Sequence, residues 1–461
     1  MKILIITHYY KHKNAMASLR PIKLAKYFAL AGHEVTVLTS LQKDNWCKQE
    51  LTPTPAQDIR EVYAPEHTGM SYLRKLYDYM ARRGKTKLEK LQQSSQPSIN
   101  ATPYNQKPSK KQQLKSWLAW YYYYSCDRIE NWCLYKGLIN AAKKEGLKGY
   151  DVVIATYPGA GIHFAGEWMK KKKRAQHFIA DYRDPAYNPG GRTNKTEIKH
   201  DKKVQDDAVN LADAIVCVSK GMADSLEEQY KDHRIAPVYV VRNGFDPADI
   251  DANADSHIES KYFNFVYTGA LYNGRRTVDM LARVLCELIE EEVISKEEIK
   301  VHYAGSDFLE MQNQLQPYGL ESIAVDHGYV TRQESLAMQC DSDVVLLLNW
   351  NQDNYTGVIP GKIYEYMSAK KTICALIMGN QGGSETANMI RQDNIGCACE
   401  QPVPEDLGKL KEYMQKMFVD YHNGVRRSLA TESTNKYNYE HIAQEYLQVI
   451  NKTVNELYKQ S

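Results

Sequence analysis

Short apolar segments alternate with helical segments along almost the whole chain, and this alternation constrains the fold more than any other feature of the sequence. The first apolar segment, KILIIT at residues 2–7, has the character of a buried strand. The segment PIKLAKYFALAG at 21–32 has an apolar helical face, with Pro21 near its start and Gly32 at its end, and HEVTVLTS at 33–40 follows as a second strand. Strands and helices that alternate in this way favour an α/β fold with parallel sheets.

The predicted strands fall into two series separated by a linker. The intervening sequence NGFDPADIDANADSH is rich in Asp, Asn and Ala and contains a proline, which is typical of a linker. We therefore predict two doubly wound, Rossmann-like parallel-sheet domains that face a cleft, at residues 1–245 and 260–435, with a helix at 436–461 that crosses back to the first domain. After the first two strands, the others are expected at 151–156, 175–182, 213–219 and 238–243, and then at 263–269, 300–305, 324–329, 343–349, 372–378 and 395–400.

Residues 41–125 interrupt this alternation. The stretch SSQPSINATPYNQKPSKKQQ is poor in apolar residues and contains two prolines and several serines, so we expect a long mobile insertion in the first domain rather than part of the core. At residues 107–124, four lysines precede two tryptophans and four consecutive tyrosines. Two interpretations stay open: peripheral contact with an anionic membrane, or an aromatic helix packed on the N-terminal core after a basic lead-in.

Composition narrows the function classes. The 461 residues are 43% hydrophobic, and no run approaches the roughly 18 apolar residues of a membrane span. The net charge of +3 gives no reason to expect a nucleic-acid partner. Nine scattered cysteines without a CxxC pair indicate neither a zinc site nor a disulfide framework. The N-terminus also lacks the features of a signal peptide, so a cytoplasmic location is expected.

The loop after the strand at 343–349 carries residues suited to a diphosphate. Loops at the carboxyl ends of parallel strands are where such sheets bind ligands. In the stretch NYTGVIPGKIYEYMSAKKTICAL, Gly361 allows close backbone approach at the start of a helix, and Lys362 adds a full positive charge. Glu365, one turn later, can accept hydrogen bonds from a ribose diol. The alternative is an ordinary surface Lys–Glu pair.

A second strand-end loop, GALYNGRR, has the same character. Gly269 and Gly274 give a flexible turn, and Arg275 and Arg276 close it just before a helix. Arginine can hold phosphate oxygens with two parallel hydrogen bonds, so two cationic loops of one sheet could meet on one diphosphate. The alternative is a solvated basic pair.

Taken in order along the chain, several motifs resemble those of GT-B glycosyltransferases of family 4, in particular the bacterial enzymes of polysaccharide assembly. The resemblance covers nearly the whole chain outside 41–125. The motifs that carry it are HEVTVLTS, ADYRDP, ADSL after VCVSKGM, VVRNGFDP, YTGALYNGRR and GVIPGKIYEYMSAKKTICAL.

The resemblance implies a retaining transfer from a nucleotide-sugar donor, held by the C-terminal domain, to a saccharide or lipid-linked acceptor. Carried onto this chain, it assigns Glu365 to the donor ribose and Arg275 or Arg276, with Lys362, to the diphosphate. A nucleotide sugar would be a substrate, and no cofactor or metal ion is expected. In one departure, the family's first glutamate is replaced here by Gly357, so contacts to the donor sugar must be made differently.

Further candidates lie in the first half of the chain. The loop before the first helix contains Ser18 and Arg20 and resembles the family's loop over the donor phosphates. Arg183 and Asp184 of ADYRDP are candidates for the acceptor side, and the alternative is a capped turn with an internal ion pair. His163 follows another strand and is a third catalytic candidate, although a lone histidine is often structural.

Two motifs in the sequence compete with this interpretation. GAGIHFAG at 159–166 imitates a dinucleotide-binding fingerprint, but position 164, where the third glycine belongs, is Phe. The DSD at 341–343 imitates a metal-binding aspartate pair, but it precedes its strand and so lies at the wrong end of the sheet. The alternatives to a transferase are a nucleotide-sugar-binding scaffold without turnover, a GT-B epimerase and a dinucleotide oxidoreductase.

Overall fold

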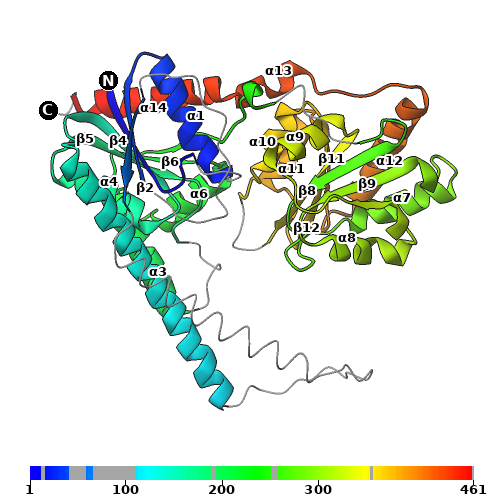
Figure 1. Cartoon of the computed structure of the whole chain (residues 1–461), viewed down its shortest axis with the longest axis horizontal. Coiled ribbons are helices and arrows are strands. Elements are labelled where there is room, and N and C mark those ends of the chain that lie inside the picture. Colours follow the sequence, from blue (N-terminus) through cyan, green and yellow to red (C-terminus); the bar gives the residue numbers. More distant parts are fainter. Residues whose placement is uncertain are drawn as a thin grey trace.

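A computed structural model describes residues 1–11, 16–40, 59–65, 110–187, 194–250, 258–352 and 357–458. The chain forms two α/β domains, each built on one parallel sheet and joined by the segment that follows β7 (Figure 1). The predicted fold class of two doubly wound parallel-sheet domains is confirmed. Within the described residues, no helix is both long enough and apolar enough to cross a membrane.

The N-terminal sheet has seven parallel strands in the order β3-β2-β1-β4-β5-β6-β7. Its central strands are buried on both faces, which is why they are continuous apolar runs in the sequence. The strands are β1 (Lys2–Thr7), β2 (Glu34–Ser40), β3 (Ile59–Ala64), β4 (Tyr150–Tyr157), β5 (Ala175–Tyr182), β6 (Ala214–Cys217) and β7 (Val238–Val240), and the helices are α1 (Met16–Leu30), α3 (Lys110–Lys144), α4 (Ala160–Lys171), α5 (Lys195–Leu211) and α6 (Lys220–Gln229).

The C-terminal sheet has six parallel strands in the order β10-β9-β8-β11-β12-β13. The order reverses between β8 and β11, which is the switch point where open α/β sheets bind ligands. The strands are β8 (Phe263–Thr268), β9 (Ile299–Ala304), β10 (Ala324–Asp326), β11 (Val344–Asn351), β12 (Thr372–Gly379) and β13 (Gly396–Glu400), and the helices are α7 (Asp279–Glu290), α8 (Phe308–Leu315), α9 (Arg332–Asp341), α10 (Lys362–Ser368), α11 (Glu385–Gln392) and α12 (Pro404–His422).

The last helix, α14 (Tyr439–Tyr458), follows the short helix α13 (Thr431–Thr434) and packs on the N-terminal domain. Its Tyr439, Ile442 and Tyr446 belong to the same buried cluster as Ile5 of β1 and Leu24 of α1. Figure 1 shows α14 lying beside α1, far from the C-terminal sheet. The chain therefore crosses between the domains twice, once after β7 and once before α14.

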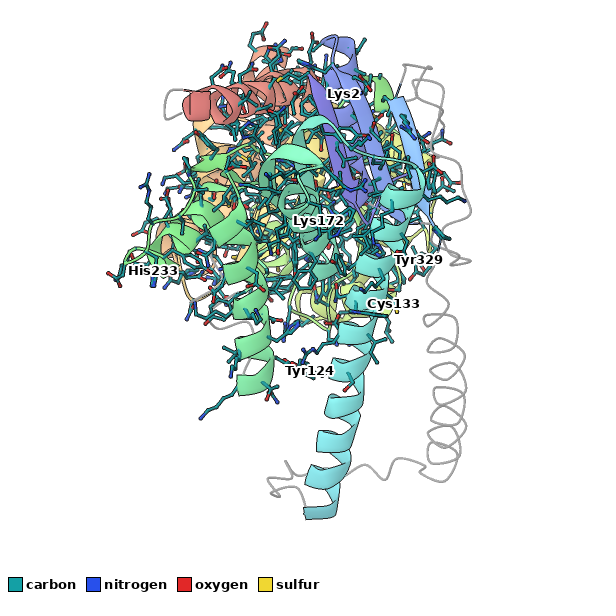
Figure 2. All side chains as sticks on the ribbon, turned by 90° about the vertical axis from the view of Figure 1, so that its left-hand side faces the viewer. Lys2, Tyr124, Cys133, Lys172, His233 and Tyr329 are labelled. Atoms are coloured by element: carbon teal, nitrogen blue, oxygen red, sulfur yellow. The ribbon has the colours of Figure 1, made fainter. Side chains whose placement is uncertain are left out.

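Parts of residues 41–125 differ from the expected insertion. Residues 59–64 form the edge strand β3, in which Val62 and Ala64 are buried, and α3 begins at Lys110. The adjacent charged residues Arg60 and Glu61 interrupt the apolar residues of this edge strand, so no continuous apolar run marks it. Figure 2 shows Tyr124 on the part of α3 that extends beyond the domain, whereas Cys133, farther along, is buried. Residues 107–109 and the side chains of 110–123 lie outside the described residues, so membrane contact through 107–124 stays a prediction.

Helix α1 begins earlier than predicted, at Met16 rather than near Pro21. Pro21 therefore lies inside the helix, and because proline has no backbone N–H, the carbonyl of Ala17 loses its usual helical donor. Arg183 replaces that donor through its Nη1. Because α1 begins early, the candidate residues Ser18 and Arg20 lie inside this helix, and the candidate Arg183 donates a hydrogen bond to it.

Candidate functional site

Two predicted residues meet at the carboxyl end of β8. Lys362, the first residue of α10, donates from Nζ to Oγ1 of Thr268 over 3.3 Å. Gly269 has a φ of +142°, and a Cβ at this position would lie 3.0 Å from Cε of Lys362. Because glycine at position 269 has no side chain, it leaves space for the side chain of Lys362 to pass over the end of β8. The structure brings Gly269 and Lys362 together, as the sequence led us to expect.

Arg276 lies in the same region, between two aromatic rings. Its guanidinium carbon is 4.6 Å from the ring centre of Tyr272 and 5.2 Å from that of Trp350. Its Nη1 donates to Oη of Tyr267 over 3.3 Å, while its buried Nε has no hydrogen-bond partner among the described residues. A positioned guanidinium with an unused donor suits an anionic ligand.

Arg275 points elsewhere. It is exposed, and with Trp350, Gln352 and Asn380 it lines an open cavity of about 500 Å³ at the ends of the C-terminal strands. The loop that carries both arginines contains two non-glycine residues with left-handed backbone, Tyr272 and Asn273, both at φ +53°. Such conformations cost free energy and concentrate at ligand-binding sites.

Glu365 is buried on α10, one turn after Lys362, with 7% of its surface exposed. Its Oε1 lies 3.4 Å from Nε of Arg332, the first residue of α9. Burial lowers the pKa of Lys362; the negative charge of Glu365 opposes this shift, and the positive charge of Arg276 adds to it. Lys362, Arg276 and Glu365 thus form one coupled cluster that can accept an anion beside a hydrogen-bond acceptor.

Arg332 was not predicted from the sequence. The signal that could have found it is its place in the segment GYVTRQE, which follows β10 as the other site loops follow their strands. A basic residue just after a parallel strand is a candidate ligand contact on the same grounds as Arg276.

The two glycines of the β11–α10 loop differ from what the sequence suggested. Gly361 has an ordinary helical φ of −57°, so nothing in its backbone demands glycine. Gly357 has a φ of +81°, and a Cβ there would lie 2.7 Å from Cα of Gly221 on α6 of the other domain. At this distance backbone atoms must move, so only glycine fits position 357 in this domain arrangement.

Ser18 and Arg20 do not form a loop over donor phosphates, because both lie inside α1 on its buried side. Ser18 is 0% and Arg20 is 1% exposed. Arg20 donates to both carboxylate oxygens of Asp181, over 2.8 and 3.2 Å, and to the carbonyl of Arg242 over 2.8 Å. Arg20 is buried and paired with Asp181, whereas the buried Oγ of Ser18 has no hydrogen-bond partner among the described residues. The expected loop position of both residues is wrong, and their donor-binding role stays a prediction.

The acceptor-side candidates occupy different environments. Arg183 donates to the carbonyls of Tyr157, over 2.9 Å, and Ala17, and its buried Nη2 has no partner among the described residues. Asp184 is exposed; desolvation by the surrounding protein raises the pKa of its carboxyl, and neighbouring Arg183 opposes that rise. These two residues stay candidates for acceptor contact.

His163 is completely buried, and its ring packs edge-on against Tyr182 at 4.8 Å. Burial lowers its pKa to about 4, and neither ring nitrogen has a hydrogen-bond partner among the described residues. A neutral, enclosed imidazole matches the structural interpretation, and the structure does not bring His163 to the cluster around Lys362.

Glu385 forms several hydrogen bonds between the two domains, and it was not predicted from the sequence. This first residue of α11 accepts hydrogen bonds from the backbone N–H groups of Lys220, over 3.0 Å, and Gly221, over 2.9 Å. Arg242 donates to the same carboxylate. A carboxylate at a helix N-terminus is favoured both by the free N–H groups and by the helix dipole. Glu385 therefore joins the C-terminal domain to the start of α6.

No protein-family model matches the sequence, and no curated protein matches it either. Solved structures match it over nearly its full length. A sucrose-phosphate synthase from Thermosynechococcus elongatus is 13% identical, with a TM-score of 0.58 and 100% of both chains covered. A mutant of S. aureus TarM in complex with Fondaparinux, alpha-GlcNAc-glycerol and UDP is 12% identical, with a TM-score of 0.52 and coverage of 98% of this chain and 99% of that one.

The apo form of the lipopolysaccharide outer core galactosyltransferase WaaB is 13% identical, with a TM-score of 0.50 over 98% of this chain and 99% of that one. Identities this low show the fold alone. With two parallel-sheet domains matched from end to end, the chain has the GT-B fold.

Proposed function

We propose that this protein is a retaining glycosyltransferase of the family 4 type that moves a hexosyl or N-acetylhexosaminyl group from a nucleoside diphosphate sugar, with UDP as the expected nucleotide. One observation carries the proposal: Lys362, Arg276 and Glu365, from two strand-end loops, form a single cluster at the switch point of the C-terminal sheet. In support, one solved structure of the same fold contains UDP and another is a galactosyltransferase.

In the proposed reaction, the bond between the anomeric carbon and the diphosphate oxygen breaks, and a bond from the acceptor oxygen to that carbon forms on the same face of the sugar. The acceptor proton leaves with the nucleoside diphosphate. Negative charge grows on the departing phosphate, so fixed positive charge there lowers the barrier. Arg276 and Lys362 would supply this charge, and we propose that they do so without a metal ion. Glu365 would hold the ribose hydroxyls.

The experiment is a transfer assay with radiolabelled nucleotide sugars and saccharide acceptors, together with calorimetric titration of UDP. Glu365→Ala and Arg276→Ala should each weaken UDP binding by roughly tenfold or more, since a hydrogen bond to a charged group contributes about 1.5–3 kcal/mol. Arg283→Ala is a matched control, because Arg283 is an exposed arginine of the same domain that pairs with Glu287. Unchanged UDP affinity in both site variants would remove this assignment.

For the acceptor, we propose a saccharide or a lipid-linked saccharide of cell-surface polysaccharide synthesis, met at the membrane surface through residues 107–124. Four lysines in this segment precede two tryptophans, which is the composition of a segment at a lipid interface. The test is co-sedimentation with anionic vesicles at low salt. Equal binding by the wild type and by a variant with Lys107, Lys110, Lys111 and Lys115 changed to Glu would refute the membrane contact.

A second candidate function is a nucleotide-sugar-binding scaffold without turnover. The observation in its favour is that position 357, where the resembled family has a glutamate, is glycine and is enclosed by the other domain. A scaffold would bind UDP and respond to Glu365→Ala as above, but would release no labelled product with any acceptor. The transfer assay therefore separates the two functions.

A further inference from the structure

Arg332 lies between two carboxylates. Its Nε is 3.4 Å from Oε1 of Glu365, and its Nη2 is 3.7 Å from Oδ2 of Asp249 in the segment between the domains. A capping box fixes where α9 starts: Oγ1 of Thr331 accepts from the N–H of Glu334, and the carboxylate of Glu334 accepts from the N–H of Thr331. The helix start thus places the arginine beside Glu365.

We infer that Arg332 is a positioning residue of the donor site, which holds the Glu365 carboxylate in place and turned toward the ribose of a bound nucleotide. This inference rests on the proposed function, since it concerns the residue assigned to the ribose. It adds a third cation, from a third strand-end loop, to the cluster of Arg276 and Lys362.

The need for such a residue follows from burial. A carboxylate with only 7% of its surface exposed is costly to bury without a nearby cation. Lys362 is close enough to interact with Glu365 electrostatically, but we assign its charge to the diphosphate. Arg332 is therefore the cation that stays with Glu365 when a nucleotide is bound.

The geometry favours positioning over competition with the ribose. Arg332 approaches Oε1 of Glu365, so we assign the other carboxylate oxygen, Oε2, to the ribose hydroxyls. The Nε–Oε1 separation of 3.4 Å is an ion pair rather than a hydrogen bond, and the buried Nε has no hydrogen-bond partner among the described residues. A ribose hydroxyl bound at Oε2 would not displace the arginine from Oε1.

The opposite side of Arg332 faces the N-terminal domain. Asp249, its second carboxylate, accepts from Nζ of Lys23 on α1 over 2.5 Å. Lys23 also donates to Asp246, over 2.8 Å. The ion pairs therefore continue from the ribose-binding carboxylate through Arg332 to the first domain, and Asp249 restrains the guanidinium on the side away from the donor.

The test is a double-mutant cycle on the full chain, with calorimetric titration of UDP and of inorganic diphosphate. Arg332→Ala should weaken UDP binding fivefold or more and leave inorganic diphosphate binding within twofold, because the diphosphate is assigned to Lys362 and Arg276. In a Glu365→Ala background, the same substitution should change UDP affinity less than twofold. Arg332→Lys should restore part of the loss, and Arg283→Ala should have no effect.

Each outcome is decisive. Equal UDP affinity in Arg332→Ala and wild type, or tighter binding by the variant, overturns the inference while the proposed function stands. If Arg332→Ala reduces UDP affinity equally in the wild type and in the Glu365→Ala background, the inference is also overturned, because Arg332 would then contact the nucleotide directly or act through the fold. Thermal unfolding without ligand shows whether Arg332→Ala is folded. If it is not, Arg332→Lys replaces it, and its UDP affinity with and without Glu365 is judged in the same way. If the wild type binds no nucleoside diphosphate, the proposed function and the inference fall together.

Discussion

Replacing Gly357 by alanine should separate the two domains without unfolding either of them. The added Cβ would lie 2.7 Å from Cα and 2.8 Å from C of Gly221, and 2.8 Å from the backbone nitrogen of Met222. All three atoms belong to the backbone of α6, so no side-chain rotation relieves the contact. The φ of +81° adds a conformational cost of about 1–2 kcal/mol for any residue with a Cβ.

The relief of this clash costs further contacts. Moving α6 away from the loop lengthens the hydrogen bonds that Lys220 and Gly221 donate to Glu385, now 3.0 and 2.9 Å. A hydrogen bond to a charged group contributes about 1.5–3 kcal/mol. Loss of even one of them, together with the backbone cost, disfavours the present arrangement by roughly 3 kcal/mol, or about a hundredfold in population.

Small-angle X-ray scattering measures this change directly. The Gly357→Ala variant should have a larger radius of gyration than the wild type, and saturating UDP sugar should reduce the difference if the donor favours closure. The matched control is Gly408→Ala, since no atom lies within 4 Å of a Cβ added at Gly408 on α12. Superimposable profiles for wild type and Gly357→Ala, with equal thermal stability, would refute the argument that this contact sets the domain arrangement.

Three further predictions concern charge and stability. UDP affinity should fall as pH rises above neutral, because Lys362 loses its positive charge. Since the pKa of Lys362 is lowered, this loss of affinity should begin at a lower pH than it would for a lysine with an ordinary pKa. Calorimetric titration of the wild type and of Lys362→Arg checks this, and the arginine variant should keep its UDP affinity over the same pH range. Because burial lowers the pKa of His163 to about 4, the unfolded chain binds more protons than the folded one between pH 6.5 and about 4, so His163 should cost up to roughly 3 kcal/mol of stability as pH falls through that window. Urea unfolding of His163→Phe should show a weaker loss than the wild type over the same range. Arg20→Met should destabilise the protein by about 3–5 kcal/mol because it leaves Asp181 buried and unpaired, and Asp181→Asn combined with it should recover part of that loss in urea unfolding.

The strands were predictable because most of them are buried on both faces. Apolar runs such as VVLLL of β11 follow directly from that burial, and the order of strands along the chain then gives the fold class. Edge strand β3 was missed because only two of its six residues, Val62 and Ala64, are buried, and the charged Arg60 and Glu61 break its apolar run. The start of α1 was misplaced because Pro21 is usually found in the first turn of a helix, whereas here Arg183 takes the carbonyl that the proline leaves without a donor.

The site was predictable to the extent that it depends on strand ends. Gly269, Arg276 and Lys362 follow neighbouring parallel strands, so sheet topology alone brings them together. The environments of Arg20 and Arg332 depend on which side of a helix faces which carboxylate, and residue spacing does not determine this. Ser18 and Arg20 were placed in a loop for the same reason that the start of α1 was misplaced, and a loop and a buried helical turn expose different side chains.

Gly357, at the position where the resembled family has a glutamate, was the feature that most favoured a scaffold over an enzyme. The structure offers another reason for a glycine at this position. Backbone atoms of α6 lie within 2.8 Å of where its Cβ would be, so a side chain there is incompatible with this domain arrangement whatever the chemistry requires. Glu385, at the start of α11, accepts hydrogen bonds from the N–H groups of Lys220 and Gly221, beside the same contact. Because the glycine is explained by domain contact, its presence does not by itself indicate a lost catalytic group. The cluster around Lys362 supports donor binding under either function, so the choice between enzyme and scaffold depends on the transfer assay.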